Sequence, residues 1–189
     1  GTSFTYQSMG TLIIAELVQR LTGQSIHDFL RTELFEPLQL SSTRLGAAGI
    51  DRTRIVRLRT PVEQESSWNW NSRYWQDLGA PWGGLFRTPA EYAVLCQLML
   101  DQGRHGDRQI VSPATVRMMT TNRLDDLPEV PESLRRTKAW GLGWQMNHPT
   151  GSDSLCDLLG PDAFGHIGAT GTTVWCDLRT KAFCVLFTS

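Results

Sequence analysis

The chain has 189 residues, with 18 basic and 19 acidic side chains and a formal net charge of −1. This balance excludes a strongly basic surface for nucleic acid, and the apolar stretches are far shorter than the ~20 residues of a membrane span. Hydrophobic residues make up 40% of the chain and charged residues 20%, which is typical of a globular domain and excludes a disordered one.

Two helices are predicted at the start of the chain. Apolar residues recur at helical spacing over residues 8–21, and Thr22-Gly23 supplies a stop. Ser25 can cap a second helix, with Asp28 at the matching capping-box position. This helix must end near Glu36, because the following proline restricts its predecessor.

Periodicity fades between residues 41 and 81, where the aromatic-rich stretch 67–75 shows neither helical nor strand spacing. We expect a long irregular connection there, and such connections are usually functional or ordered by another part of the molecule. A helix should then start at Thr88-Pro89 and run to Gly103, and Ser112-Pro113 should open a shorter one.

After Trp140 the pattern changes to strands, which we predict over 141–146, 172–177 and 182–187. Helices followed by an antiparallel hairpin indicate an α+β fold. We divide the chain into a mainly helical and loop region, 1–139, and antiparallel strands, 140–189. The last predicted strand is apolar and would be left uncovered by these residues alone, so we expect it to belong to a larger folded unit. Uncovered sheet edges would favour self-association.

Several common catalytic motifs are missing from the sequence. It contains no GxSxG elbow, no HExxH and no P-loop. Lys138 and Lys181 are its only lysines, and Arg135 and Leu178 stand three residues before them, so no SxxK can be built. The four cysteines form no CxxC pair, and we expect neither a zinc site nor another cofactor.

Segments along the whole chain occur in a familiar order. Tyr6-Gln7-Ser8 precedes the first helix, Gly83-Gly84-Leu85 precedes the helix at Thr88, and His166-Ile167-Gly168-Ala169-Thr170-Gly171 leads into a strand. With Glu36-Pro37-Leu38 and Trp140-Gly141-Leu142-Gly143-Trp144, these segments resemble the serine β-lactamase and penicillin-binding-protein superfamily, in its class C β-lactamase, DD-peptidase and esterase branch. The resemblance implies a partial β-lactamase/transpeptidase-like fold: the helical region and the later strands of the sheet, without the SxxK segment.

The resemblance implies catalytic positions at the start of the first helix. Tyr6 matches the family tyrosine, which moves protons between the nucleophilic serine and the leaving group. A phenol serves as a base only where nearby cations favour its anion. Ser8 stands where the family often has asparagine, and a hydroxyl cannot reproduce the two-sided hydrogen bonding of an amide. This departure fits an esterase-like relative better than one that recognises an amide.

The resemblance also implies substrate-binding positions at the later strand. His166 occupies the place of the lysine in the family's Lys-Thr-Gly, and would hydrogen-bond or attract an anionic substrate group when charged. Ile167 removes the threonine hydroxyl. Gly168 would let substrate approach the backbone, and the Ala169 N–H would be one oxyanion-hole donor.

Taken singly, these residues have simpler interpretations. A tyrosine before a helix is more often a packing residue, and a histidine beside glycines can simply cap a turn. The order of the motifs carries the functional interpretation. It implies part of a serine hydrolase that forms an acyl-enzyme on an ester, a β-lactam or a D-amino-acid peptide, inactive by itself because the nucleophile is absent.

The alternative is a non-catalytic module that binds a ligand or partner through the same cleft. The expected partner of the enzyme is a small-molecule or peptidoglycan-like substrate. Residues 1–10 carry no signal-peptide pattern, and only the resemblance points to a periplasmic or extracellular location.

Overall fold

The computed structural model describes residues 2–59, 69–147 and 157–189. The chain forms two compact units: the strand unit, residues 2–5 and 92–188, and the loop unit, residues 6–91 with the last residue. In chain order the described elements are α1 (Met9–Thr22), α2 (Ile26–Leu30), η1 (Arg31–Phe35), β1 (Arg44–Leu45), η2 (Arg52–Arg54), α3 (Arg73–Leu78), β2 (Leu85–Phe86), α4 (Pro89–Leu100), β3 (Arg104–His105), β4 (Arg108–Gln109), α5 (Pro113–Met119), η4 (Arg123–Asp126), α6 (Glu132–Thr137), β5 (Gln145–Met146), β6 (Ala163–Ile167), β7 (Thr173–Asp177) and β8 (Ala182–Leu186). Helices with antiparallel sheets confirm the expected α+β class.

The predicted first helix is confirmed as α1. It ends at Gly23, which takes the left-handed conformation (φ 72°) that glycine adopts without steric cost. Five apolar side chains of α1 remain 51–84% exposed: Met9, Ile13, Ile14, Leu17 and Leu21.

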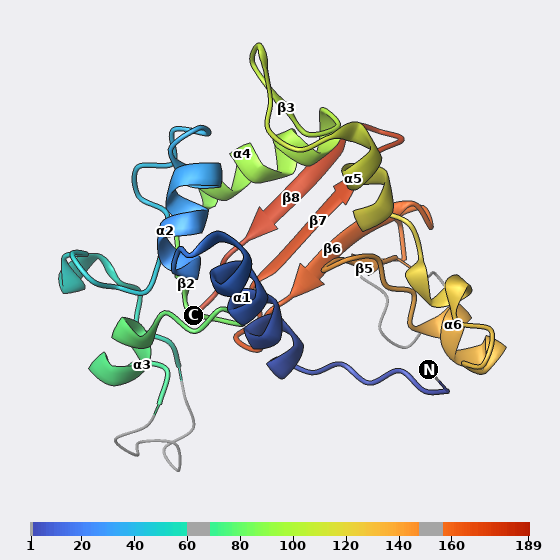
Figure 1. The fold of residues 1–189 in the computed structure, drawn as a ribbon, viewed down its shortest axis with the longest axis horizontal. Coiled ribbons are helices and arrows are strands. Elements are labelled where there is room, and N and C mark those ends of the chain that lie inside the picture. Colours follow the sequence, from blue (N-terminus) through green and yellow to red (C-terminus); the bar gives the residue numbers. More distant parts are fainter. Residues whose placement is uncertain (1, 60–68, 148–156) are drawn as a thin grey trace. The chain divides into compact units, whose positions relative to one another are not determined.

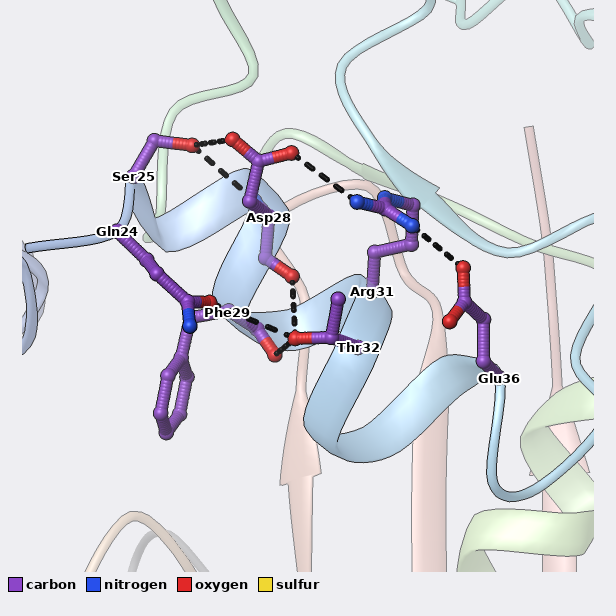
Figure 2. A network of polar contacts seen from close by, with 7 residues as sticks. All are labelled: Gln24, Ser25, Asp28, Phe29, Arg31, Thr32 and Glu36. Atoms are coloured by element: carbon purple, nitrogen blue, oxygen red, sulfur yellow. Dashed lines mark hydrogen bonds and ion pairs between the residues drawn. The ribbon is translucent and has the colours of Figure 1, made fainter. Parts of the chain in front are cut away.

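The second helix begins at the predicted cap (Figure 2). The Ser25 hydroxyl accepts a hydrogen bond from the Asp28 N–H at 3.1 Å and donates one to the Asp28 carboxylate at 2.7 Å. Arg31 joins the Asp28 and Glu36 carboxylates. The helix ends before Pro37 as predicted, but its second half, η1, is a π-helix in which the Glu36 N–H donates to the Arg31 carbonyl at 2.9 Å.

The expectation of an irregular connection from 41 to 81 is wrong in part. β1 pairs with β2 in antiparallel register. α3 follows its N-cap residue Ser72, whose hydroxyl accepts from the Trp75 N–H. The pairing joins segments about forty residues apart, so local periodicity could not reveal it. Residues 67 and 68 of the aromatic stretch lie outside the described residues.

The strand unit contains a four-stranded antiparallel sheet in the order β5-β6-β7-β8 (Figure 1). β7 and β8 confirm two predicted strands. The strand predicted over 141–146 is wrong for its first four residues, because Gly143 has φ 81° and the Gly141 N–H donates to the Trp144 carbonyl. This hydrogen bond closes a turn, so that only β5 pairs with β6.

The core of the strand unit lies between α4, α5 and the sheet. The buried members of this cluster are Tyr92, Cys96, Met99, Leu100, Val116, Ala139, Met146, Phe164, Val174 and Cys176. α4 starts at the predicted cap, where the Thr88 hydroxyl accepts from the Glu91 N–H at 3.2 Å. Fully burying a side chain such as Phe164 stabilises the fold by about 1.5–3 kcal/mol, so this cluster holds β6 and β7 firmly in place.

The turn between β7 and β8 is fixed by a buried carboxylate. Asp177 is 3% exposed and accepts from the Arg179 N–H at 2.8 Å and the Thr180 hydroxyl at 2.9 Å. Burial alone would raise the pKa of Asp177, but these hydrogen bonds outweigh it, and the pKa lies below its ordinary value. Lys181 then donates to the Leu100 carbonyl at the end of α4, at 2.9 Å.

None of the helices in the described part of the chain combines the length and the hydropathy needed to cross a membrane.

Candidate functional site

The candidate site of the strand unit lies at the end of β6. This strand is central, with β5 on one side and β7 on the other. Its first three residues, 163–165, are buried, and His166 at its end is half-buried. A Cβ atom on Gly165 would lie 2.0 Å from the Val174 carbonyl oxygen, so only glycine lets the two strands approach as they do. The sheet therefore presents His166 on a rigid support.

The imidazole of His166 has a defined hydrogen bond. Its Nδ1 lies 2.8 Å from the carbonyl oxygen of Ile167. A carbonyl only accepts, so Nδ1 must carry the proton, and in the neutral ring Nε2 is then the acceptor nitrogen. The backbone thus selects one tautomer of the neutral ring and fixes the orientation of the ring.

Aromatic side chains flank this imidazole. The Trp140 ring meets it edge-on, with centroids 5.5 Å apart and planes at 74°, and the Phe4 ring lies 6.2 Å from Trp140. The backbone of Trp140 is anchored, because its main-chain N–H donates to the side-chain oxygen of Asn122 at 3.2 Å. Trp140 was not among the predicted site residues. No local signal would have found it, because its contact with His166 depends on pairing across the sheet.

A tight turn follows β6. The Gly168 N–H donates to the Thr172 carbonyl at 2.8 Å, and the Gly171 N–H donates to the Gly168 carbonyl at 3.0 Å. A Cβ atom on Gly168 would lie 2.3 Å from the Thr172 hydroxyl. Ala169 is exposed at the tip of this turn, and its N–H has no acceptor among the residues that the structure describes. The turn therefore holds one backbone donor open.

Tyr6 and Ser8 lie together at the start of α1, in the loop unit. The Tyr6 side chain is 56% exposed. Ser8 occupies the N-cap position, but its backbone is already helical and its hydroxyl makes no capping bond. The structure thus brings His166, Gly168 and Ala169 together at one end of β6, and Tyr6 and Ser8 together in the other unit.

The buried cysteines are placed for packing. Cys96 and Cys176 belong to the core of the strand unit. A hydrogen bond with Cys96, followed by burial, raises the pKa of the Cys176 thiol, which disfavours the reactive thiolate. Within the described ranges, no group of three or more histidine, cysteine or carboxylate side chains is placed to hold a metal ion.

Comparisons with known proteins extend over the whole chain. The family model described as Beta-lactamase matches residues 1–189. A relative from Escherichia coli O157:H7, named "Putative D-alanyl-D-alanine carboxypeptidase", is 26% identical over 196 residues, which cover 94% of this chain and 43% of the relative. The N-acetylmuramyl-L-alanine amidase of Bacillus subtilis is 25% identical over 94% of this chain and 42% of its own length.

Solved structures agree on the fold. The crystal structure of a beta-lactamase from Mycobacterium bovis has a TM-score of 0.67 and 22% identity, covering 97% of this chain and 56% of its own. The chain spans less than half the length of the two curated relatives. The match of the family model to every residue shows that the chain belongs to the beta-lactamase family.

Proposed function

We propose that the chain is the part of a β-lactamase-related serine hydrolase that supplies the proton-transfer tyrosine and the substrate-binding strand. The single observation that carries this proposal is the end of β6, where the Ile167 carbonyl holds the His166 ring and the following turn exposes Ala169, whose N–H has no acceptor among the residues that the structure describes. The family match over all 189 residues supports it. No SxxK can be built from the lysines present, so the nucleophilic serine comes from outside these residues.

The proposed reaction proceeds through an acyl-enzyme. The serine oxygen bonds to the carbonyl carbon of the substrate, and its proton passes to the Tyr6 phenolate. The Ala169 N–H donates to the negative oxygen that develops on the carbonyl. When the bond to the leaving group breaks, Tyr6 returns the proton to that group. Water then adds to the carbonyl carbon of the acyl-enzyme and gives a proton to Tyr6. As the bond to the serine oxygen breaks, Tyr6 passes this proton to that oxygen, which restores the serine and releases the acid. His166, at the end of β6, contacts the bound substrate.

The scissile bond belongs to an ester, a β-lactam or a D-amino-acid peptide. The names of both curated relatives refer to amide bonds beside an alanine, which supports a peptidoglycan-like amide. Ser8 supports an ester, because a single hydroxyl offers less to an amide than asparagine does. Comparing an activated ester with a D-alanyl-D-alanine peptide separates these two substrates.

The second candidate is a non-catalytic module that binds a ligand or a partner through the same residues. It is favoured by the lack of an SxxK in the 189 residues. A native protein that binds a penicillin reversibly, without a gain in mass, would support this module over the enzyme.

The enzyme proposal is tested by acylation kinetics. The native protein is incubated with a fluorescent penicillin and an activated ester, and the Tyr6→Phe variant is compared with Tyr74→Phe. Tyr74 is a matched control, since it lies in the same unit and is 58% exposed against 56% for Tyr6. We expect Tyr6→Phe to slow acylation by about 10²-fold or more and Tyr74→Phe to leave it unchanged. Equal rates for the two variants would contradict the proposal.

A further inference from the structure

A cluster of arginines in the loop unit has no part in the proposed reaction. The segment 51–59 contains four arginines, at positions 52, 54, 57 and 59. Two of them, Arg52 and Arg57, line an open cavity of about 450 Å³ together with Arg73 of α3. The other described residues of its lining are Ile55, Asn71 and Gln76. The hollow is open to solvent, and its three arginines are exposed.

Hydrogen bonds hold the walls of this cavity in place. The Asn71 side chain accepts from the Leu58 N–H at 2.8 Å and donates to the Leu58 carbonyl at 2.9 Å. This pair of bonds fixes the segment that bears Arg57 against the segment that leads into α3. The Gln76 side chain accepts from Arg52 at 2.6 Å, which orients that guanidinium. These bonds therefore hold the backbone at Leu58 and the Arg52 guanidinium in place before any ligand arrives.

Among the residues that the structure describes, the cavity carries more positive than negative charge. Arg52 and Arg73 share one carboxylate, that of Asp77. The hydrogen bond from Arg52 lowers the pKa of Asp77, so this carboxylate stays ionised at neutral pH. Arg57 is exposed, and it forms no ion pair with any residue that the structure describes. Among the residues that the structure describes, three guanidinium groups therefore lie near one carboxylate, and several of their N–H donors have no described acceptor.

We propose that this cavity binds a small ligand through an oxyanion, a carboxylate or a phosphate group, held by Arg57 together with the remaining donors of Arg52 and Arg73. Guanidinium groups match the planar geometry of these anions and bind them through paired hydrogen bonds. Asn71 and Gln76 are neutral, so these two side chains restrict the shape of the ligand and do not select its charge. This site is independent of the acyl-enzyme proposal, because no residue is shared between them.

The test uses the native protein that contains these 189 residues and measures binding by calorimetry at constant ionic strength. The probes are inorganic phosphate, succinate and the neutral control succinamide. The variants are Arg57→Gln and, as the matched control, Arg54→Gln. Arg54 is an exposed arginine of the same segment that does not line the cavity, so both variants change the net charge equally. Melting temperatures without ligand check that both variants fold.

We expect saturable binding of phosphate or succinate and none of succinamide. Arg57→Gln should weaken binding by about tenfold or more, and Arg54→Gln by less than about twofold. Tighter binding of phosphate would identify a phosphate ester as the ligand class, and tighter binding of succinate a carboxylate. The proposal is overturned if neither anion saturates, or if Arg54→Gln weakens binding as much as Arg57→Gln does.

Discussion

Replacing Asp177 with alanine tests how the turn between β7 and β8 holds the sheet. The carboxylate accepts two short hydrogen bonds, at 2.8 and 2.9 Å, and a longer one from the Thr180 N–H at 3.4 Å. Each of the two short bonds stabilises the fold by about 1 kcal/mol. The donor residues Arg179 and Thr180 are exposed, so water can partly replace these bonds in the variant. We therefore expect Asp177→Ala to lower the free energy of unfolding by about 2 kcal/mol at pH 7, measured by urea denaturation followed by circular dichroism.

The pH dependence of the same variant separates charge from packing. Because the native pKa of Asp177 lies below the ordinary value of 3.8, its ionised form stabilises the fold above pH 3.8, and this contribution is lost as the pH falls through the native pKa. The difference between Asp177→Ala and the wild type should therefore shrink below pH 3.8. Asp177→Asn, which keeps one acceptor, should lose about half as much. A loss under about 0.5 kcal/mol for Asp177→Ala at pH 7 would refute this reasoning.

Two further substitutions test the loop unit and the support of the candidate site. Ser25→Ala should lower the free energy of unfolding by about 1 kcal/mol, measured by thermal unfolding. Ser8→Ala should lower it by less than half of that, because Ser8 makes no capping bond. Equal losses for the two variants would contradict the assignment of the cap. Gly165→Ala should cost about 3 kcal/mol or prevent folding, since its Cβ atom would meet the Val174 carbonyl at 2.0 Å. Gly10→Ala is the control, because nothing lies within 4 Å of its Cβ position, and it should stabilise α1 by up to about 1 kcal/mol. Similar melting temperatures for the two glycine variants would argue against the close approach of β6 and β7.

The sequence predicted those elements whose signals are local. The caps at Ser25, Thr88 and Ser112 each lie within four residues of the groups that they satisfy, so the helix starts are readable from the sequence. The strands β7 and β8 were predicted because their apolar runs are separated by a short polar turn.

The missed features depend on distant pairing or on backbone geometry. The β1–β2 pair joins Arg44 to Phe86, and no short window contains both residues. The strand expected from residue 141 was wrong because the positive φ of Gly143 turns the backbone away. The π-helical turn η1 was also missed, since its hydrogen-bond shift leaves the apolar spacing of the sequence unchanged.

The candidate site was predicted as separate residues rather than as a geometry. The resemblance supplied His166 and Ala169, and the structure adds the bond that selects the tautomer of His166. Trp140 was identified as part of a family segment, but its edge-on contact with His166 follows only from the folded sheet. The roles of Tyr6 and Ser8 stay predictions.

The most direct test of the acyl-enzyme account is to locate the acyl group by peptide mass mapping after the native protein reacts with a penicillin or an activated ester. The account predicts one added acyl mass, on the serine of an SxxK segment outside these 189 residues, and no label on the 189-residue chain alone. An acyl group on a residue within the 189, or a native protein that takes no label from either probe, would contradict it.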